Sequence, residues 1–421
     1  MFLFLNKSRI EIDIFYMDLV GQSRTNLDII MKVGTLNLSD LIRFEEQIVK
    51  GVTVDIIEQV PIIKTHMSRT EFMRLIDLGV LAPSADNLQP WKFKILDAQM
   101  DLYLDSKFTQ NFCDENLLAP YLSAGAVIEN LRVAASELAH NLLVSYFPDA
   151  NDSKFVASLR LKHSGSNKHP HLTVIKKRLT NRKFYSSKII DSSIYENLRR
   201  LVQTESEFDL IWIQKTDPRY KRLCQLLGEA DQLRFENKRL HEEFMQTMRF
   251  NKHDREQTRD GLDIRTLEAG PGSIFLFKLI SSWKRLKCMN KLGMSRIFNA
   301  YTHFQLQTSQ ACGLIISKKH APINYVLGGE TMEKLWHEVT LQNLALQPME
   351  ALPIFLIHLK EMGCHEFDQE QQTKLKKLKE TFYSLFPIQE SNGLIFLFRI
   401  GYSRQPRIRS MRRDAESFLV K

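Results

Sequence analysis

Ten residues, 82–91, constrain the fold of this chain more than any other stretch, because they force a sharp change of chain direction. They read Ala-Pro-Ser-Ala-Asp-Asn-Leu-Gln-Pro-Trp, and two prolines among short polar side chains are typical of a tight turn. Hydrophobic periodicity predicts a short helix before them, over 69–79, and an alternating strand after them, over 91–96. The segment is either a plain helix-to-strand connection or a turn that presents Ser84 and backbone N–H groups to a polar ligand.

Bulk properties indicate an ordinary globular protein. The 421 residues are 43% hydrophobic and 25% charged, enough for two or three domains with a real core. The net charge of +9 fits an anionic ligand, loose attraction to nucleic acid or anionic lipid, or simply a mildly basic surface. The five cysteines are widely spaced and form no Cys-x-x-Cys pair, which disfavours a disulfide framework or zinc ribbon. Without a signal peptide or a membrane-length apolar run, we expect a cytoplasmic protein that does not contact membranes.

Longer elements follow from the apolar spacing. The clearest predicted helix covers 123–144, where apolar residues recur every three to four positions. The stretch over 152–170 is polar, and 164–167 within it is expected to be a loop. The long polar connection over 251–272 is expected to be a lid or a disordered segment. A faint repeat is also present: Gly125-x-x-x-Glu129 recurs as Gly329-x-x-x-Glu333, each at the start of a predicted helix.

Basic side chains gather in two further segments. Arg178, Thr180 and Arg182 alternate, so two guanidinium groups and a hydroxyl can converge on one phosphate. The segment could equally be a solvated basic strand. The tail that follows the final predicted strand ends in Arg412 and Arg413, and such a tail is usually solvated or touches nucleic acid.

These motifs together resemble the nitroreductase superfamily. The turn resembles the flavin-contacting Ala-Pro-Ser-x-x-Asn-x-Gln-Pro-Trp loop, and 178–184 resembles the Arg-x-Ser/Thr-x-Arg/Lys-x-Phe signature that binds the FMN phosphate. The resemblance also implies that a Gln-Pro-Met turn lies against the flavin ring and that the basic tail closes on the phosphate. The residues that it implies for FMN are Pro83, Ser84, Asn87, Gln89, Arg178, Thr180, Asn181, Arg182, Gln347, Pro348, Met349, Arg412 and Arg413.

The order of the motifs is reversed relative to that of ordinary nitroreductases. The Pro-Ser-x-x-Asn loop comes first here and the arginine signature some ninety residues later, and neither motif has a second copy. The resemblance is therefore to long, internally duplicated members that sequester flavin. It implies an α+β fold of mixed, mainly antiparallel sheets flanked by helices, with half-units at 66–170 and 171–421. One FMN per chain is expected, in a monomer whose two half-units form an internal pseudo-dimer. Residues 1–65 lie outside the resemblance and form an extension of unknown role. The resemblance allows this extension to be a remnant of an adenylyltransferase region of the thiamine-biosynthesis type.

Two functions follow from this resemblance, and the sequence does not choose between them. The first is NAD(P)H-dependent two-electron reduction of a small organic acceptor by the bound FMN. The second is non-enzymatic storage of FMN beneath the 251–272 lid. Tailoring of a small metabolite or peptide is a third possibility. No side chain is nominated as catalytic.

Other chemistries find no support in the sequence. His169-Pro170-His171 has no evident partners and His-Glu-x-x-His is absent, so no metal is expected. The chain contains no Gly-x-Gly-x-x-Gly or Gly-x-Ser-x-Gly motif. Because the basic segments lack interleaved aromatic residues, a nucleic-acid partner is not expected either.

Overall fold

The computed structural model describes residues 68–97, 99–109, 114–164, 169–270, 272–363 and 367–420. The chain divides into two units, Met1–Thr65 and His66–Lys421, and every described residue belongs to the second. The expected role of 1–65 as an extension therefore lies outside the described residues. No helix in the described part is both long enough and apolar enough to cross a lipid bilayer.

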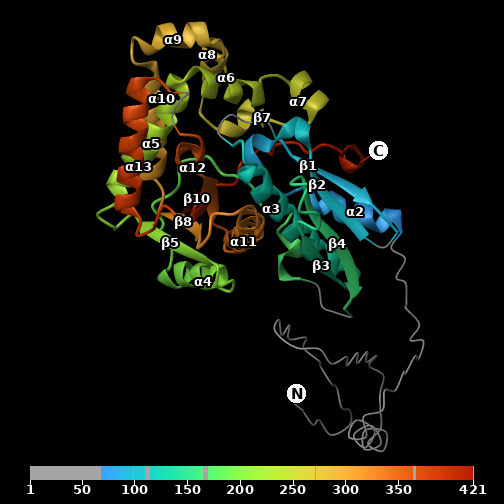
Figure 1. The fold of residues 1–421 in the computed structure, drawn as a ribbon. Helices are drawn as coiled ribbons and strands as arrows, with labels where there is room; N and C mark the ends of the chain where they lie inside the picture. Colours follow the sequence, from blue (N-terminus) through green and yellow to red (C-terminus); the bar gives the residue numbers. More distant parts are fainter. Residues whose placement is uncertain are drawn as a thin grey trace, which may run out of the picture. The chain divides into compact units, whose positions relative to one another are not determined.

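The first sheet is built from the N-terminal part of the described chain. Its four strands are antiparallel and lie in the order β1-β2-β4-β3, and two helices pack beside them (Figure 1). Helix α2 starts with a capping box in which Ser68 and Glu71 satisfy each other's backbone N–H groups. The elements are α2 (Arg69–Gly79), β1 (Trp91–Ile95), β2 (Gln99–Leu104), α3 (Leu118–Ala135), β3 (His140–Tyr146) and β4 (Phe155–His163).

The second sheet is also four-stranded and antiparallel, in the order β5-β8-β10-β9. All nine residues of β10 are buried, as expected for a strand covered on both faces. Its strands are β5 (Phe208–Gln214), β8 (Ala311–Ser317), β9 (Ala345–Pro348) and β10 (Gly393–Gly401).

Helices cover this second sheet and extend beyond it (Figure 1). Those beside the sheet are α4 (Ser192–Val202), α5 (Tyr220–Glu236), α10 (Met294–Gln307), α11 (Pro322–Leu341), α12 (Ala351–Met362) and α13 (Gln369–Leu385). Four shorter helices lie between α5 and α10 in the chain: α6 (Lys238–Thr247), α7 (Lys252–Thr258), α8 (Ser273–Ile280) and α9 (Trp283–Asn290). The expected α+β class with mainly antiparallel sheets and flanking helices is confirmed.

Helices α3 and α11 join the two sheets, and the repeated glycine motif marks their crossing. A Cβ atom on Gly125 would lie 1.8 Å from the Val326 carbonyl oxygen, and one on Gly329 would lie 2.0 Å from that of Leu122. Only glycine allows the two backbones to approach so closely. The faint repeat therefore corresponds to equivalent positions on two crossing helices, although the fusion of two half-units remains a prediction.

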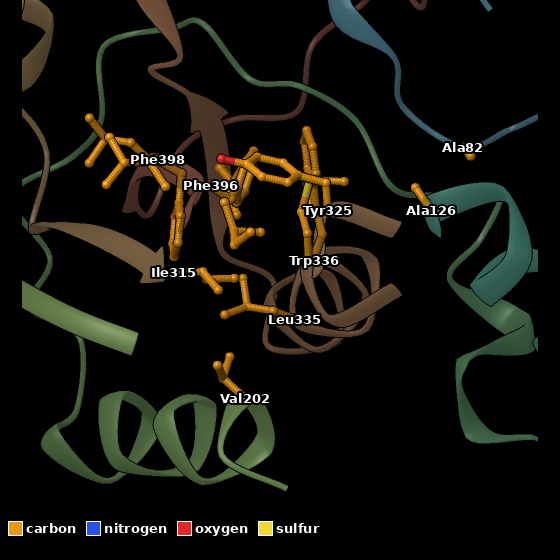
Figure 2. Close-up of a cluster of buried hydrophobic side chains, with 14 of the residues drawn as sticks. Ala82, Ala126, Val202, Ile315, Tyr325, Leu335, Trp336, Phe396 and Phe398 are labelled. Carbon is orange, nitrogen blue, oxygen red and sulfur yellow. The ribbon is translucent and has the colours of Figure 1, made fainter. Parts of the chain in front are cut away.

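One continuous apolar core runs from the first sheet through this crossing to the second sheet. Figure 2 shows part of it, where Trp336 and Leu335 of α11 face Phe396 and Phe398 of β10. The rings of Phe396 and Phe398 are stacked with centroids 5.2 Å apart. Because α11 contributes to this core and to the crossing with α3, it fixes the position of one sheet against the other.

The C-terminal tail crosses from the second sheet to the first. It leaves β10 at Gly401 and ends beside β1, where the N–H of Val420 donates to the carbonyl of Phe93 at 2.8 Å. Phe418 is fully buried and packs near Trp91, with ring centroids 6.1 Å apart. The tail is therefore packed as part of the fold and is not a free basic extension.

Some predicted elements differ from the structure. The helix expected over 123–144 begins at Leu118 and ends at Ala135, and the apolar residues after it belong to β3. Ala139 adopts a left-handed conformation with φ of 56° and turns the chain between them. The polar stretch over 152–170 contains strand β4, which was not predicted because its exposed positions carry polar side chains. Of the loop expected over 164–167, only residue 164 lies among the described residues.

Candidate functional site

The turn over 82–91 has an unusual backbone. Asp86, Asn87 and Gln89 all have positive φ angles, of 47°, 58° and 55°. Asn and Asp tolerate this left-handed region better than most residues, whereas Gln89 adopts it at a cost of about 1–3 kcal/mol. The Ser84 hydroxyl accepts a hydrogen bond from the Gln89 N–H at 2.9 Å, which closes the loop. Strain held in place by such contacts is typical of a binding loop rather than of a plain connection.

Gln89 holds this loop from behind instead of facing a ligand. Its side chain is fully buried, and its amide donates to the carbonyls of Asn87 and Arg259 at 3.2 and 3.0 Å. Its oxygen accepts from the N–H of Arg413 at 2.9 Å. The loop, the 251–272 segment and the C-terminal tail therefore meet at one buried amide.

Arg178 packs against α11, beside the start of this loop, and is almost fully buried. Its Nε is 2.9 Å from Oε1 of Glu333, its Nη2 donates to the Leu81 carbonyl at 2.7 Å, and its guanidinium lies 4.7 Å from the centre of the Trp336 ring. Burial alone would raise the pKa of Glu333, but the charges of Arg178 and His337 hold it below its usual value. Glu333 therefore carries a full negative charge beneath Arg178.

Two arginines of the tail add positive charge at the same place. Arg412 donates to the carbonyls of Val80 and Ala82 and to Oδ1 of Asn87, and Arg409 donates to the carbonyls of Lys176 and Arg178. Burial and the charge of Arg178 lower the pKa of Arg412 to about 9 and that of Arg409 to about 10. Arg178 is paired with Glu333, whereas Arg409 and Arg412 feel the charges of both groups without an ion pair of their own, which leaves an excess of positive charge that an anion would neutralise.

Arg409 was not among the predicted site residues. The resemblance had placed Arg412 and Arg413 at the site, as the basic residues that follow Gly401-Tyr402 after the last strand. The structure separates them: Arg413 turns away, donates to the carbonyls of Leu88 and Gln89, and stacks on Phe108 with its guanidinium 4.0 Å from the ring centre. No local pattern identified Arg409, because an alternating chain would place it with Arg407 and Arg413 and opposite Arg412, whereas the cavity is lined by Arg409 and Arg412.

The predicted phosphate segment runs beside β9. Thr180 forms a parallel bridge with Leu346, and the Asn181 N–H donates to the Leu346 carbonyl at 2.9 Å. Asn181 is buried and donates to the Arg404 carbonyl at 2.9 Å, so it supports the tail rather than a ligand. Arg182 points the other way and donates to the Thr266 carbonyl at 3.3 Å.

The predicted Gln347-Pro348-Met349 turn lies at the end of β9 and is followed by an unpredicted acid, Glu350. Gln347 accepts from Nε of Arg399 at 2.8 Å, and the Glu350 carboxyl accepts from the Leu397 N–H at 2.7 Å. Burial, only partly offset by that hydrogen bond, raises the pKa of Glu350 to about 8. Glu350 can therefore hold a proton near neutral pH.

These segments enclose one cavity of about 930 Å³. A volume of this size accommodates a ligand as large as a cofactor. Of the thirteen predicted residues, ten line it and three (Gln89, Asn181 and Arg413) lie behind the wall. The ten are Pro83, Ser84, Asn87, Arg178, Thr180, Arg182, Gln347, Pro348, Met349 and Arg412.

Carboxyl groups line the cavity away from the three arginines. Asp114 accepts from the N–H groups of Leu118 and Ala119 at the start of α3, yet burial raises its pKa to about 7. Burial likewise raises the pKa of Asp86, against the opposing charges of Arg234 and Arg182. The cavity is therefore polarised, with cations at the Arg178 side and protonatable acids elsewhere.

The 251–272 segment is a folded wall of this cavity and not the unstructured loop that its polarity suggested. It contains α7 and a short strand, β7 (Leu262–Asp263), which pairs in parallel with β6 (Met248–Arg249). Leu262, Thr266 and Leu267 line the cavity. The sequence reading failed because buried polar side chains, such as Asp260 and Asp263, look solvated in a sequence.

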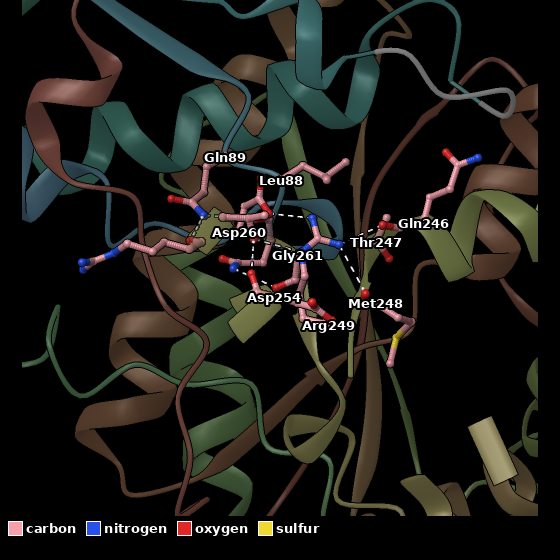
Figure 3. Close-up of polar contacts among 12 residues, drawn as sticks. Leu88, Gln89, Gln246, Thr247, Met248, Arg249, Asp254, Asp260 and Gly261 are labelled. Atoms are coloured by element: carbon pink, nitrogen blue, oxygen red, sulfur yellow. Dashed lines mark hydrogen bonds and ion pairs between the residues drawn. The ribbon is translucent and has the colours of Figure 1, made fainter. Parts of the chain in front are cut away.

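Figure 3 shows how this segment is fastened to the binding loop. Nη2 of Arg249 is 2.6 Å from Oδ1 of Asp260, and its Nε donates to the Thr258 hydroxyl at 3.0 Å. The next residue, Gly261, exchanges two hydrogen bonds with Asn87, at 3.1 and 3.0 Å. Asn87 thus holds the segment and, through Arg412, the tail.

His169 and His171 lie beside Glu129, a neighbour that the sequence did not reveal. Their ligand atoms lie within 4.8 Å of one another. The carboxylate of Glu129 already receives a hydrogen bond from Nε of Arg132 at 3.2 Å, so a cation occupies that position. The absence of a resident metal stays a prediction.

Comparison with known proteins finds partial likenesses, and no family model matches the chain. An uncharacterized protein of Mycobacterium tuberculosis (strain CDC 1551 / Oshkosh) is 24% identical over 344 residues, which cover 80% of this chain and 46% of that protein. A second relative from the same strain carries the name "Putative NAD(P)H nitroreductase acg". It is 32% identical over 84 residues, which cover 20% of this chain and 25% of that protein. This chain thus spans less than half of either relative.

Solved structures give a weak likeness. A nitroreductase-like family protein from Bacillus cereus covers 60% of this chain and 95% of its own, at 9% identity and a TM-score of 0.30. The FMN-dependent nitroreductase NfnB from Mycobacterium smegmatis, solved with NADPH, covers 55% and 86%, at 11% identity and a TM-score of 0.28. At these scores the overlaps carry no argument about this chain.

Proposed function

We propose that this chain is a flavoprotein of the nitroreductase type, which binds one FMN in the cavity and reduces a small organic acceptor with electrons from NAD(P)H. The observation that carries the proposal is that Arg178, Arg409 and Arg412, with Glu333 as the one ion-paired carboxylate among them, all line a cavity of about 930 Å³. The partial likeness to proteins named as NAD(P)H nitroreductases supports it.

The residues present fit FMN at both ends. A phosphate close to the three guanidinium groups would offset their mutual repulsion, and the Thr180 hydroxyl lines the cavity as a further donor. Most N–H groups of Arg412 already donate to backbone carbonyls, so this residue contributes charge more than direct hydrogen bonds. The ring would lie against Pro83, Ser84 and the Pro348 turn, in which the two prolines offer apolar contacts and Ser84 offers a polar one.

When bound, FMN supplies the redox chemistry, because it accepts a hydride from NAD(P)H and passes two electrons to an organic acceptor. The chain binds and orients the reactants. Glu350 and Asp114 line the cavity with pKa values of about 8 and 7, so either can hold a proton for an acceptor that gains electrons. The wall formed by 251–272 excludes water from one side.

Storage of FMN is the second candidate function, and the contacts that hold the 251–272 wall against the binding loop favour it. The two Asn87–Gly261 hydrogen bonds and the Arg249–Asp260 ion pair hold the segment closed over the binding loop. A wall that does not open would keep nicotinamide from the ring, and the chain would then store FMN without reducing anything. The enzyme and the storage protein differ only in how often this wall opens.

The decisive experiment is the visible spectrum of the purified full chain, followed by addition of NADPH and of NADH without oxygen. We expect about one FMN per chain, because the cavity holds one cluster of guanidinium groups. Rapid bleaching would identify the reductase, and stable colour would identify the storage protein. A colourless chain that also fails to bind added FMN would refute both.

An Arg178→Met variant sharpens the test. It removes the central guanidinium and should abolish retention of FMN. The control is Arg407→Met, which removes a guanidinium group from the C-terminal tail at an exposed position without a place in the cavity wall. Equal flavin content in the two variants would contradict the assigned phosphate position.

A further inference from the structure

The hairpin of α8 and α9 carries an unusual combination of exposed side chains. Phe275 is 73% exposed, Leu292 is 91% exposed, and Ile274 and Ile297 are 41% and 51% exposed. Large apolar side chains that gather on a surface mark an interaction site more often than scattered ones do. We call these four residues and the basic residues described next the α8–α9 surface.

Six basic side chains lie in the same stretch of chain, from α8 to the start of α10, and all six are exposed: Lys278, Lys284, Arg285, Lys287, Lys291 and Arg296. The sequence contains no Asp or Glu between Glu268 and Glu330. Within the described ranges, none of the six forms an ion pair; Arg285 donates only to the Leu279 and Lys278 carbonyls and the Ser281 hydroxyl. The α8–α9 surface therefore holds six positive charges with no local compensation.

The hairpin is supported from beneath, so its outer face is free to contact a large partner. Phe277, Ile280 and Leu286 point inward and form a separate apolar cluster with Phe298 of α10. In Figure 1, α8 and α9 lie at one edge of the described unit, beyond α6 and α10 and away from both sheets. A helix pair of this kind, apolar at the tip and basic around it, has the composition of segments that lie in a membrane interface.

We propose that the α8–α9 surface docks onto an anionic lipid bilayer. Lysine and arginine are attracted to acidic headgroups, while Phe275 and Leu292 enter the boundary between headgroups and acyl chains. Nucleic acid would use the cations but offers no site for exposed aliphatic side chains, so the apolar residues favour the lipid. The sequence had suggested no membrane contact, because only apolar runs long enough to span a bilayer were considered and a short helical hairpin contains none.

The wall of the cavity reaches this surface. Ile297 of α10 lines the cavity and is half exposed, and Leu276 and Phe277 of α8 line it as well. Docking would bring the rim of the cavity to the bilayer, where an apolar acceptor could enter without crossing water. This consequence rests on the proposed function, whereas binding to the bilayer does not.

The test is co-sedimentation of the full chain with vesicles of phosphatidylcholine containing about a third phosphatidylserine, against vesicles of phosphatidylcholine alone. We expect binding to the anionic vesicles only, weakened at high salt because the surface charges are screened. Phe275→Ser with Leu292→Ser, and separately Lys284→Glu with Lys287→Glu, should each reduce binding by about tenfold or more.

Matched variants control for charge and apolarity elsewhere. Ile189 is 80% exposed, and Lys376 and Lys377 are exposed on α13, so Ile189→Ser and Lys376→Glu with Lys377→Glu should bind as the unchanged chain does. In a Phe275→Trp variant, the fluorescence of the new tryptophan should be quenched by brominated lipid. Binding that is indifferent to lipid charge, or that survives both sets of α8–α9 variants, would overturn the proposal.

Two other outcomes would also overturn it. Binding to duplex DNA that depends on Lys284 and Lys287, without binding to vesicles, would assign the surface to nucleic acid. Self-association of the chain that disappears in the Phe275→Ser and Leu292→Ser variant, again without binding to vesicles, would assign it to a second copy. Flavin content is measured on the same samples. A chain that holds FMN but does not bind vesicles contradicts the docking proposal alone, whereas a chain without FMN contradicts the proposed function.

Discussion

Nε of Arg178 lies 2.9 Å from Oε1 of Glu333, and both side chains are almost completely buried. The pair joins the basic segment after the first sheet to the repeated Gly-x-x-x-Glu motif of α11. A buried carboxylate and guanidinium stabilise one another, so removal of either leaves an uncompensated charge.

We therefore expect Glu333→Gln to destabilise the chain by about 3–5 kcal/mol. Added FMN or phosphate should recover much of this loss, because the excess positive charge then has a partner. Urea unfolding with and without FMN measures both effects. Glu196→Gln, which removes an exposed ion pair with Arg200, is the control and should change stability by less than about 1 kcal/mol. A Glu333→Gln chain that ligand does not stabilise would contradict the assigned anion position.

FMN binding should weaken as the pH rises through about 9. The pKa of Arg412 lies near 9, below its ordinary value of 12.5, so the free site loses this charge at that pH. A bound phosphate favours the charged form, hence protonation and binding are linked. Fluorescence titration of FMN between pH 7 and 10 checks this. In an Arg412→Gln variant the affinity should be lower throughout and the decline shallower, and an unchanged profile would argue against Arg412.

Glu350 should make the unfolding free energy depend on pH. Its pKa is raised from 4.5 to about 8, so in that interval the folded chain binds the proton that the unfolded chain releases. Stability should fall as the pH rises from about 5 to 8, by at most about 1.4 kcal/mol per pH unit. Glu350→Gln keeps an acceptor for the Leu397 N–H and should remove this decline. Parallel curves for the two proteins would show that Glu350 titrates normally.

Arg249→Gln should loosen the 251–272 wall. It removes the ion pair with Asp260 and the hydrogen bond to Thr258 but leaves the core residues of the wall in place. Deletion of the whole segment would be a poorer test, since Leu262 and Ile264 are buried. We expect faster hydrogen exchange over 251–268 and faster reduction of FMN by NADPH. Lys252→Gln, which removes only an exposed pair with Glu256, should leave both rates unchanged.

Gly125→Ala should be among the most damaging single substitutions. The added Cβ would lie 1.8 Å from the Val326 carbonyl, and since that atom belongs to the backbone, α3 and α11 would have to separate. A loss of about 3 kcal/mol or more is expected from such overpacking. Gly270→Ala meets nothing within 4 Å and suffers only from its positive φ of 85°, so it should cost about 1 kcal/mol. Thermal unfolding of both variants distinguishes crowding from backbone strain.

Local sequence signals predicted much of the fold. Helix α2 matches its predicted range because a capping box marks its start, and β1 begins at Trp91 as expected. Strand β5 was not predicted, since Phe208–Gln214 is a short apolar run that reads equally well as part of a helix. The boundary between α3 and β3 was also lost, because apolar residues continue across it and only the turn at Ala139 separates them.

Site residues were predictable where they belong to a contiguous motif. They were not predictable where tertiary packing determines the direction or the burial of a side chain. Ser84 and Arg178 line the cavity as the motifs implied. Gln89 and Asn181 belong to the same motifs but face the protein interior, and a sequence does not record which way a side chain turns. Glu350 gained its raised pKa from burial alone, for which no local pattern exists.

The tail that closes the cavity has a consequence for the order of folding. Arg412 bonds to Asn87 across 325 residues, and Val420 pairs with Phe93 at the edge of the first sheet. Contacts between residues so far apart in the chain form slowly, because the long intervening loop must first be closed. We therefore expect refolding to build the two sheets before the anion-binding end of the cavity, so that ligand binding is gained only in a late kinetic phase, and we expect a chain truncated before residue 409 to fold most of its core without gaining the site.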